Sequence, residues 1–124
     1  MRVLSVDDSE PIRRFIKTAV DVLGFEFLEA ADGKAALELL EEERGEIDLI
    51  LLDWHMPMMD GMQVLEALKA DHRFEDIPVT MVTQETEMDR VTEAINKGAK
   101  NYLIKPFSQE DLTGKIMESL GLEL

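Results

Sequence analysis

Cysteine is absent from this chain of 124 residues, which excludes a disulfide framework and a thiolate metal site. Basic side chains are scarce, since 13 Lys and Arg stand against 27 Asp and Glu, giving a formal charge of −14. A protein with this negative charge is repelled by phosphate-rich surfaces, which argues against binding to nucleic acid or to an anionic membrane. No apolar stretch approaches membrane-spanning length, and the N-terminus MRVLSVDDSE is too polar for a signal peptide. The sequence therefore predicts a cytoplasmic protein.

The sequence also has no internal repeat, low-complexity tract or linker, and its length suits one domain spanning residues 1–124. Its main feature is an alternation of strand-like and helix-like periods. Strands are expected at residues 2–6, 25–30, 47–53, 78–83 and 100–104. Five strand–helix units in a row predict an α/β fold with a parallel sheet, helices on both faces and right-handed crossovers.

Helix starts and ends carry their own signals. N-caps are expected at Ser9, Asp32 and Ser108, the last in a capping box with Asp111. The second helix is expected over residues 32–43, and Asp60-Gly61 opens the third. The first and fourth helices are expected to end at glycines. The inward-facing residues expected for the fourth helix are Met88, Val91 and Ile95.

Polar residues gather where the predicted strands end. The first strand ends in Asp7-Asp8, the third in Asp53, the fourth in Thr83 and the fifth in Lys105. Functional sites of open parallel sheets lie outside the carboxyl ends of the strands. The sequence therefore predicts that these side chains share one site.

The side chains expected at this site suit the binding of a metal ion and of a phosphoryl group. Three carboxylates against one lysine leave a formal charge of −2, which one divalent cation would neutralise, and all-oxygen ligands suit Mg²⁺. An aspartate is an effective nucleophile toward phosphoryl groups, and a metal, a lysine and a hydroxyl stabilise the charge of a transferred phosphoryl group. The pattern predicts phosphoryl transfer to Asp53, with Asp7, Asp8 and a metal as its partners.

Five motifs, in order and spacing, extend this pattern over the whole chain: VDDS, DWHMPMMDG, the strand end at Thr83, Tyr102 and KPF. With them the sequence resembles the receiver domains of two-component response regulators, most of all the free-standing, CheY-like chemotaxis type. The resemblance implies a flavodoxin-like, doubly wound fold with strand order 2-1-3-4-5 and five helices.

The same resemblance assigns roles at the site. Asp53 would accept a phosphoryl group from the phosphohistidine of a sensor histidine kinase. Mg²⁺ would be held by Asp8, Asp53 and the backbone carbonyl of His55, with Asp7 acting through water. Lys105 would pair with the phosphoryl oxygens. The His55 side chain is expected to be exposed.

A switch is also implied by the resemblance. Thr83 would move toward the phosphate while Tyr102 turns inward, remodelling the surface of the fourth helix, fifth strand and fifth helix for a downstream protein. Pro106 is a candidate for a cis peptide bond. The protein would be a phosphoacceptor that catalyses only its own phosphorylation and dephosphorylation, and not an enzyme acting on other substrates.

One residue departs from the family pattern. The position after Thr83 is typically small, whereas here it is Gln84. We expect Gln84, Glu85 and Trp54 at the rim of the pocket, with Trp54 partly exposed, and we expect Gln84 to slow the access of small phosphodonors or water.

Two other functions fit the sequence less well. A phosphatase with an aspartate nucleophile would need a D-x-D pair at the first strand end, and a flavin mononucleotide carrier would not place VDDSEP against its phosphate. No effector region is expected after the fifth helix, so the output is expected to be protein binding, as in chemotaxis or flagellar control. A phosphate sink or a relay receiver is the alternative.

Overall fold

The computed structural model describes residues 1–44, 46–84 and 89–122. Its sheet has five strands: β1 (Arg2–Val6), β2 (Glu26–Ala30), β3 (Leu49–Asp53), β4 (Val79–Gln84) and β5 (Asn101–Lys105). Neighbouring strands are all parallel, and their order is β2-β1-β3-β4-β5. The predicted fold class and strand order are confirmed.

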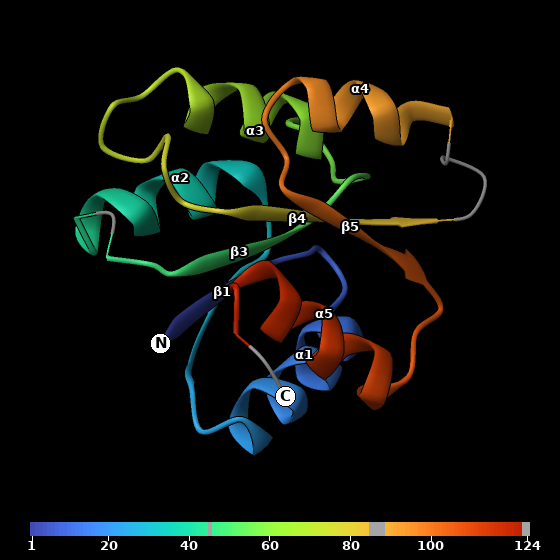
Figure 1. Ribbon diagram of the computed structural model, residues 1–124. Coiled ribbons are helices and arrows are strands. Elements are labelled where there is room, and N and C mark those ends of the chain that lie inside the picture. Colours follow the sequence, from blue (N-terminus) through green and yellow to red (C-terminus); the bar gives the residue numbers. More distant parts are fainter. Residues whose placement is uncertain (45, 85–88, 123–124) are drawn as a thin grey trace.

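Five helices connect or follow these strands in the described residues: α1 (Glu10–Val22), α2 (Gly33–Glu42), α3 (Gly61–Lys69), α4 (Val91–Asn96) and α5 (Gln109–Ser119). Helices α1 and α5 cover one face of the sheet, while α2, α3 and α4 cover the other (Figure 1). Within the described ranges, each helix is too short or too polar to cross a bilayer.

The helix starts follow from side chains that cap free backbone N–H groups. Ser9 and Asp32 each accept a hydrogen bond from the N–H three residues further on. Asp60 opens α3 in a capping box, and Ser108 forms the predicted capping box with Asp111 at the start of α5. These short-range signals are readable in a sequence because cap and partner lie within one turn.

The core forms two layers, one on each face of the sheet. Leu4, Ile50, Leu52 and Met81 belong to the cluster under α2, α3 and α4, while Leu51 packs in the cluster under α1 and α5. All five residues of β3 are buried because this strand is central and covered on both faces. Asp53 is therefore a carboxylate at the end of a strand that is otherwise entirely apolar.

Of the three inward-facing residues expected for the fourth helix, one is exposed and one lies outside the described residues. Ile95 is 40% exposed, so its predicted inward orientation is wrong. Val91 and Ala94 are the buried residues of α4. Because successive helical residues turn by about 100°, Ile95 falls at the edge of the stripe that these two define. Met88 lies outside the described residues.

Strand limits differ slightly from the predicted ones. Strand β4 extends one residue beyond Thr83, because Gln84 still pairs with Lys105 of β5. Strand β3 begins at Leu49, two residues later than expected. Asp48, just before it, accepts a hydrogen bond from the N–H of Arg2 through its carboxylate (2.7 Å).

Candidate functional site

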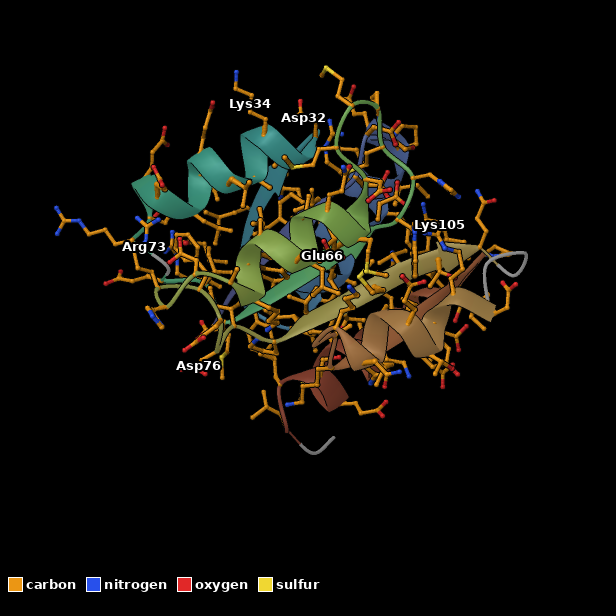
Figure 2. The ribbon with its side chains drawn as sticks, turned by 90° about the horizontal axis from the view of Figure 1, so that it is seen from above. Asp32, Lys34, Glu66, Arg73, Asp76 and Lys105 are labelled. Carbon is orange, nitrogen blue, oxygen red and sulfur yellow. The ribbon has the colours of Figure 1, made fainter. Side chains whose placement is uncertain are left out.

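The site lies at the carboxyl ends of β1, β3, β4 and β5. The strand order reverses between β1 and β3, so Asp7 and Asp8 lie on one side of the switch point and Asp53 on the other. One oxygen from each of these three carboxylates lies within 4.8 Å of the other two. Lys105 lies at this end of the molecule, across the view in Figure 2 from Arg73 and Asp76. The structure thus brings together the acid pair, Asp53 and Lys105.

Lys105 bridges the two buried carboxylates. Its Nζ donates to Asp53 Oδ1 at 3.0 Å and to Asp7 Oδ2 at 3.2 Å. Burial alone would lower the pKa of Lys105, but the charges of Asp53 and Asp7 outweigh it, and the pKa lies above its ordinary value. The ammonium group therefore stays charged.

For Asp53, by contrast, the effect of burial on the pKa outweighs the effect of the neighbouring opposite charge. Burial raises the pKa of Asp53 to about 6, and the nearby charge of Asp7 acts in the same direction, against the lowering effect of Lys105. Lys105 thus offsets only part of the combined effect of burial and of Asp7. The three carboxylates carry a formal charge of −3, or −2 with Lys105 included, and this all-oxygen set fits a hard divalent cation such as Mg²⁺.

The two residues of the acid pair have different surroundings. Asp7 is 2% exposed, and its carboxylate already accepts from the Ser9 N–H (Oδ1, 2.8 Å) and from Lys105 (Oδ2). Asp8 is exposed. Both carboxylate oxygens of Asp7 thus already accept a hydrogen bond, whereas the carboxylate of Asp8 faces solvent.

Thr83 and Tyr102 lie on the face of the sheet that α4 covers. Thr83 is buried, and its hydroxyl donates to the carbonyl of Gln84 (2.9 Å). Tyr102 pairs with Met81 in the register of β4 and β5, and it packs at half-burial against the same core as Met81. Since side chains two apart on a strand share a face, Thr83 and Tyr102 lie on the same side of neighbouring strands.

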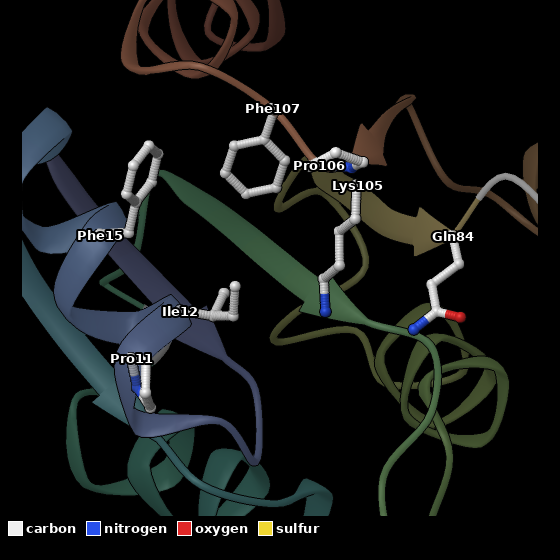
Figure 3. A pocket seen from close by; sticks show the side chains of 7 residues that line it. All are labelled: Pro11, Ile12, Phe15, Gln84, Lys105, Pro106 and Phe107. Atoms are coloured by element: carbon white, nitrogen blue, oxygen red, sulfur yellow. The ribbon is translucent and has the colours of Figure 1, made fainter.

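An apolar hollow of about 610 Å³ opens beside the site. Figure 3 shows Gln84 and Lys105 on one side of it and the rings of Phe15 and Phe107 on the other. The peptide bond before Pro106, another lining residue, is cis. Gln84 therefore lines the hollow beside Lys105, while Glu85 lies outside the described residues.

Trp54 differs from its expected position. It was expected to be partly exposed at the rim, but the side chain is fully buried (0% exposed). The guanidinium of Arg90, at the start of α4, lies 4.9 Å from the centroid of the indole ring. Trp54 is a core residue directly after Asp53, and that expectation is wrong. His55, the next residue, has the exposed side chain that was expected.

Two further residues near the site were not identified from the sequence. Arg90 covers Trp54, and Arg13 on α1 donates a hydrogen bond to the backbone carbonyl of Asp7 (2.6 Å). The bond from Arg13 to Asp7 spans six positions and matches no capping or i,i+4 pattern. The contact between Arg90 and Trp54 is more distant still in the sequence, so neither residue had a short-range signal.

With this geometry established, comparison with known proteins identifies the class. Residues 3–117 match the family described as the response regulator receiver domain. The chain belongs to this family and is a two-component response regulator.

Individual relatives agree with this class. The chain is 42% identical over 117 residues to the chemotaxis protein CheY of Pseudomonas aeruginosa, covering 94% of this chain and 93% of that one. It is 38% identical over 122 residues to CheY1 of Helicobacter pylori, covering 98% of each. Among solved structures, the chemotaxis response regulator CheY4 of Vibrio cholerae superposes with a TM-score of 0.88 at 34% identity, covering 96% of this chain and 98% of that one.

Proposed function

We propose that this protein, taken as one receiver domain over residues 1–124, is a phosphorylation-controlled switch whose phosphoacceptor is Asp53. The observation that carries the proposal is the contact of Lys105 with both Asp53 and Asp7 beside the exposed Asp8. A buried aspartate at a strand end, with an ammonium group at 3.0 Å, suits nucleophilic attack followed by charge neutralisation of the product.

The reaction exchanges one bond to phosphorus for another. A carboxylate oxygen of Asp53 bonds to phosphorus as the phosphorus–nitrogen bond of a kinase phosphohistidine breaks, and the imidazole ring keeps the electron pair. Lys105 then pairs with the phosphoryl oxygens, and the Thr83 hydroxyl leaves the carbonyl of Gln84 to donate to one of them. The same site hydrolyses its own acyl phosphate, and no other substrate is turned over.

Magnesium belongs to this proposal as the resident cation. Asp8, Asp53 and the backbone carbonyl of His55 would hold it, with Asp7 contributing through water. When bound, Mg²⁺ supplies the positive charge that offsets the carboxylates and the phosphoryl oxygens. The clustering of the three carboxylates supports this assignment, because one oxygen of each lies within 4.8 Å of the other two and only Lys105 offsets their charge among the contacts described above.

The output surface is proposed to be α4, β5 and α5. Tyr102, which lies on β5 on the same side of the sheet as Thr83, lines a polar hollow of about 770 Å³ with Lys115 and Glu118 of α5. A change at Thr83 therefore has a short route to this surface. We propose a sensor histidine kinase as donor and a chemotaxis or flagellar protein as target, with a phosphate sink or relay as the alternative. The relatives named as chemotaxis proteins support the chemotaxis target. We propose a cytoplasmic location, where ATP can maintain the kinase phosphohistidine.

The test is mass spectrometry of the intact protein after incubation with acetyl phosphate or with a phosphorylated kinase. We expect one added phosphoryl group with Mg²⁺, none with EDTA, and rapid loss of the group in alkali. Asp53→Asn should abolish the added mass. Retention of the same added mass by Asp53→Asn would contradict the proposal.

A further inference from the structure

Arg13 connects three parts of the chain that meet at the site. Its Nη1 donates to the backbone carbonyl of Asp7 at 2.6 Å, and its Nε donates to Glu29 Oε1 of β2 at 2.8 Å. The side chain is only 13% exposed, although it carries a charge. A guanidinium this well covered and held at two points has a fixed orientation.

The bond to the Asp7 carbonyl bears on Asp8 rather than on Asp7 alone. The carbonyl of Asp7 and the N–H of Asp8 belong to one planar peptide unit, so the direction of that carbonyl fixes where Asp8 begins. The remaining polar groups of Asp7 are held as well: its N–H donates to the carbonyl of Ala30 (3.1 Å) and its carboxylate accepts from Ser9 and Lys105. The Arg13 bond completes this set of contacts.

We propose that Arg13 is a positioning residue for magnesium: it holds the peptide that orients the proposed ligand Asp8, and Glu29 aligns its guanidinium. The inference rests on the proposed function, since it assigns Arg13 to the metal site described there. Arg13 does not contact the reacting atoms. Removal of contacts that orient metal ligands typically weakens metal binding about 10- to 100-fold.

A neighbouring residue offers a matched control. Arg14 also pairs with Glu29, through Oε2, but its side chain is 49% exposed and it contributes no bond to Asp7. Arg14→Gln removes the same charge as Arg13→Gln and leaves the Asp7 carbonyl bonded. Comparison of the two variants therefore separates the effect of the hydrogen bond to the Asp7 carbonyl from the effect of the lost positive charge.

The effect of charge alone has the opposite sign. Removing a positive group near a cation site strengthens the attraction for Mg²⁺, so an Arg13 that acted only through charge would make Arg13→Gln bind magnesium more tightly. Arg13→Lys keeps the charge but has no planar fork with which to bridge Glu29 and the Asp7 carbonyl. A loss in both variants would thus identify the orientation of the peptide as the cause.

The experiment is calorimetric titration of the folded proteins with MgCl₂, with circular dichroism to verify the fold. We expect Arg13→Gln to bind about tenfold more weakly, Arg13→Lys several-fold more weakly, and Arg14→Gln within about twofold of the parent. Affinity equal to or above that of the parent in Arg13→Gln would overturn the inference, and so would an equal loss in Arg14→Gln.

A second readout separates this inference from the proposed function. In the metal-free protein, Arg13→Gln should shift the nuclear magnetic resonance signal of the Asp8 amide, whereas Arg14→Gln should leave it in place. A parent protein that binds no Mg²⁺ at millimolar concentration would contradict the proposed function, and the Asp8 signal would then still decide the role of Arg13. An unchanged Asp8 amide in Arg13→Gln would refute that role.

Discussion

At the scale of single residues, Asp53 combines functional placement with a cost in stability. Burial raises the pKa of Asp53 to about 6, above its unfolded value near 3.8. Between these two values the folded state binds more protons than the unfolded state, so stability falls as pH rises through this window and stays lower above it. This difference in the pKa of Asp53 corresponds to a loss of at most about 3 kcal/mol in the free energy of unfolding. Residual interactions in the unfolded chain and local rearrangement make the actual loss smaller.

The first prediction follows from this sign. In EDTA at pH 7–8, Asp53→Asn should raise the free energy of unfolding by about 1–3 kcal/mol, and the gain should disappear toward pH 4. Urea unfolding at several pH values measures it. Asp71→Asn provides the contrast: Arg73 lowers the pKa of Asp71 to about 2, so this substitution should slightly reduce stability at neutral pH. An Asp53→Asn protein no more stable than the parent at pH 8 would show that Asp53 is not under electrostatic strain.

Gln84 is the second residue with a specific consequence. It pairs with Lys105 in the sheet and lines the apolar hollow that opens beside Lys105 (Figure 3). We predict that a glutamine here narrows the path of a small phosphodonor to Asp53. We expect Gln84→Ala to speed phosphorylation by acetyl phosphate about fivefold, equivalent to about 1 kcal/mol of barrier, with magnesium affinity nearly unchanged.

Stopped-flow traces of Trp54 fluorescence measure this rate. Gln84→Met is the matched control, because it keeps the length of the side chain but removes the amide. If bulk matters, the methionine variant should remain slow; if a hydrogen-bonded water matters, it should be as fast as the alanine variant. Superimposable rates for the parent and Gln84→Ala would leave no role for Gln84 in donor access.

At the scale of elements, α4 packs against the core through one face, and its cap residue stacks on a buried ring. It spans six residues, buries Val91 and Ala94, and has no side-chain hydrogen bond at its cap residue Arg90. The guanidinium of Arg90 instead covers the ring of Trp54, the residue after Asp53. The start of α4 is thus attached directly to the neighbour of the proposed phosphoacceptor.

We therefore predict that Arg90→Ala loosens α4. Hydrogen exchange in α4 should quicken, Trp54 should become more accessible to acrylamide, and the free energy of unfolding should fall by about 0.5–1 kcal/mol. Arg73→Ala is the control, because Arg73 stacks on Phe74 at 4.7 Å at the opposite end of the molecule (Figure 2). Quenching of Trp54 that is identical in the parent and Arg90→Ala would contradict the coupling.

Elements also show how far the sequence predicts this structure. The alternation of strands and helices and the caps at Ser9, Asp32 and Ser108 were predictable, because each signal lies within one turn or one strand period. The gathering of Asp7, Asp8, Asp53 and Lys105 was also predictable, because parallel strands end at one edge. The burial of Trp54 was not, since it depends on core packing with distant parts of the chain, and even its stacking partner Arg90 lies 36 positions further along. The exposure of Ile95 likewise depends on how α4 turns against the sheet.

At the scale of the whole molecule, the formal charge of −14 sets the response to ions. Self-repulsion of like charges destabilises a compact chain, and any salt relieves part of it by screening. A bound cation acts differently, because it stabilises only the folded state that assembles its ligands. The two effects are separable when NaCl and MgCl₂ are compared at the same ionic strength.

The last prediction concerns that difference. MgCl₂ at ten times its dissociation constant should stabilise the parent by about 1.4 kcal/mol beyond matched NaCl, raising the thermal midpoint by on the order of 5 °C. Asp8→Asn should lose this specific increment while keeping the response to NaCl. Asp76→Asn removes the same charge at the end of the molecule opposite Lys105 and should keep both responses (Figure 2). Calorimetric midpoints of the three proteins decide the matter: an Asp8→Asn protein with the full magnesium increment would remove Asp8 from the metal site, whereas an Asp76→Asn protein without it would reduce the effect to overall charge.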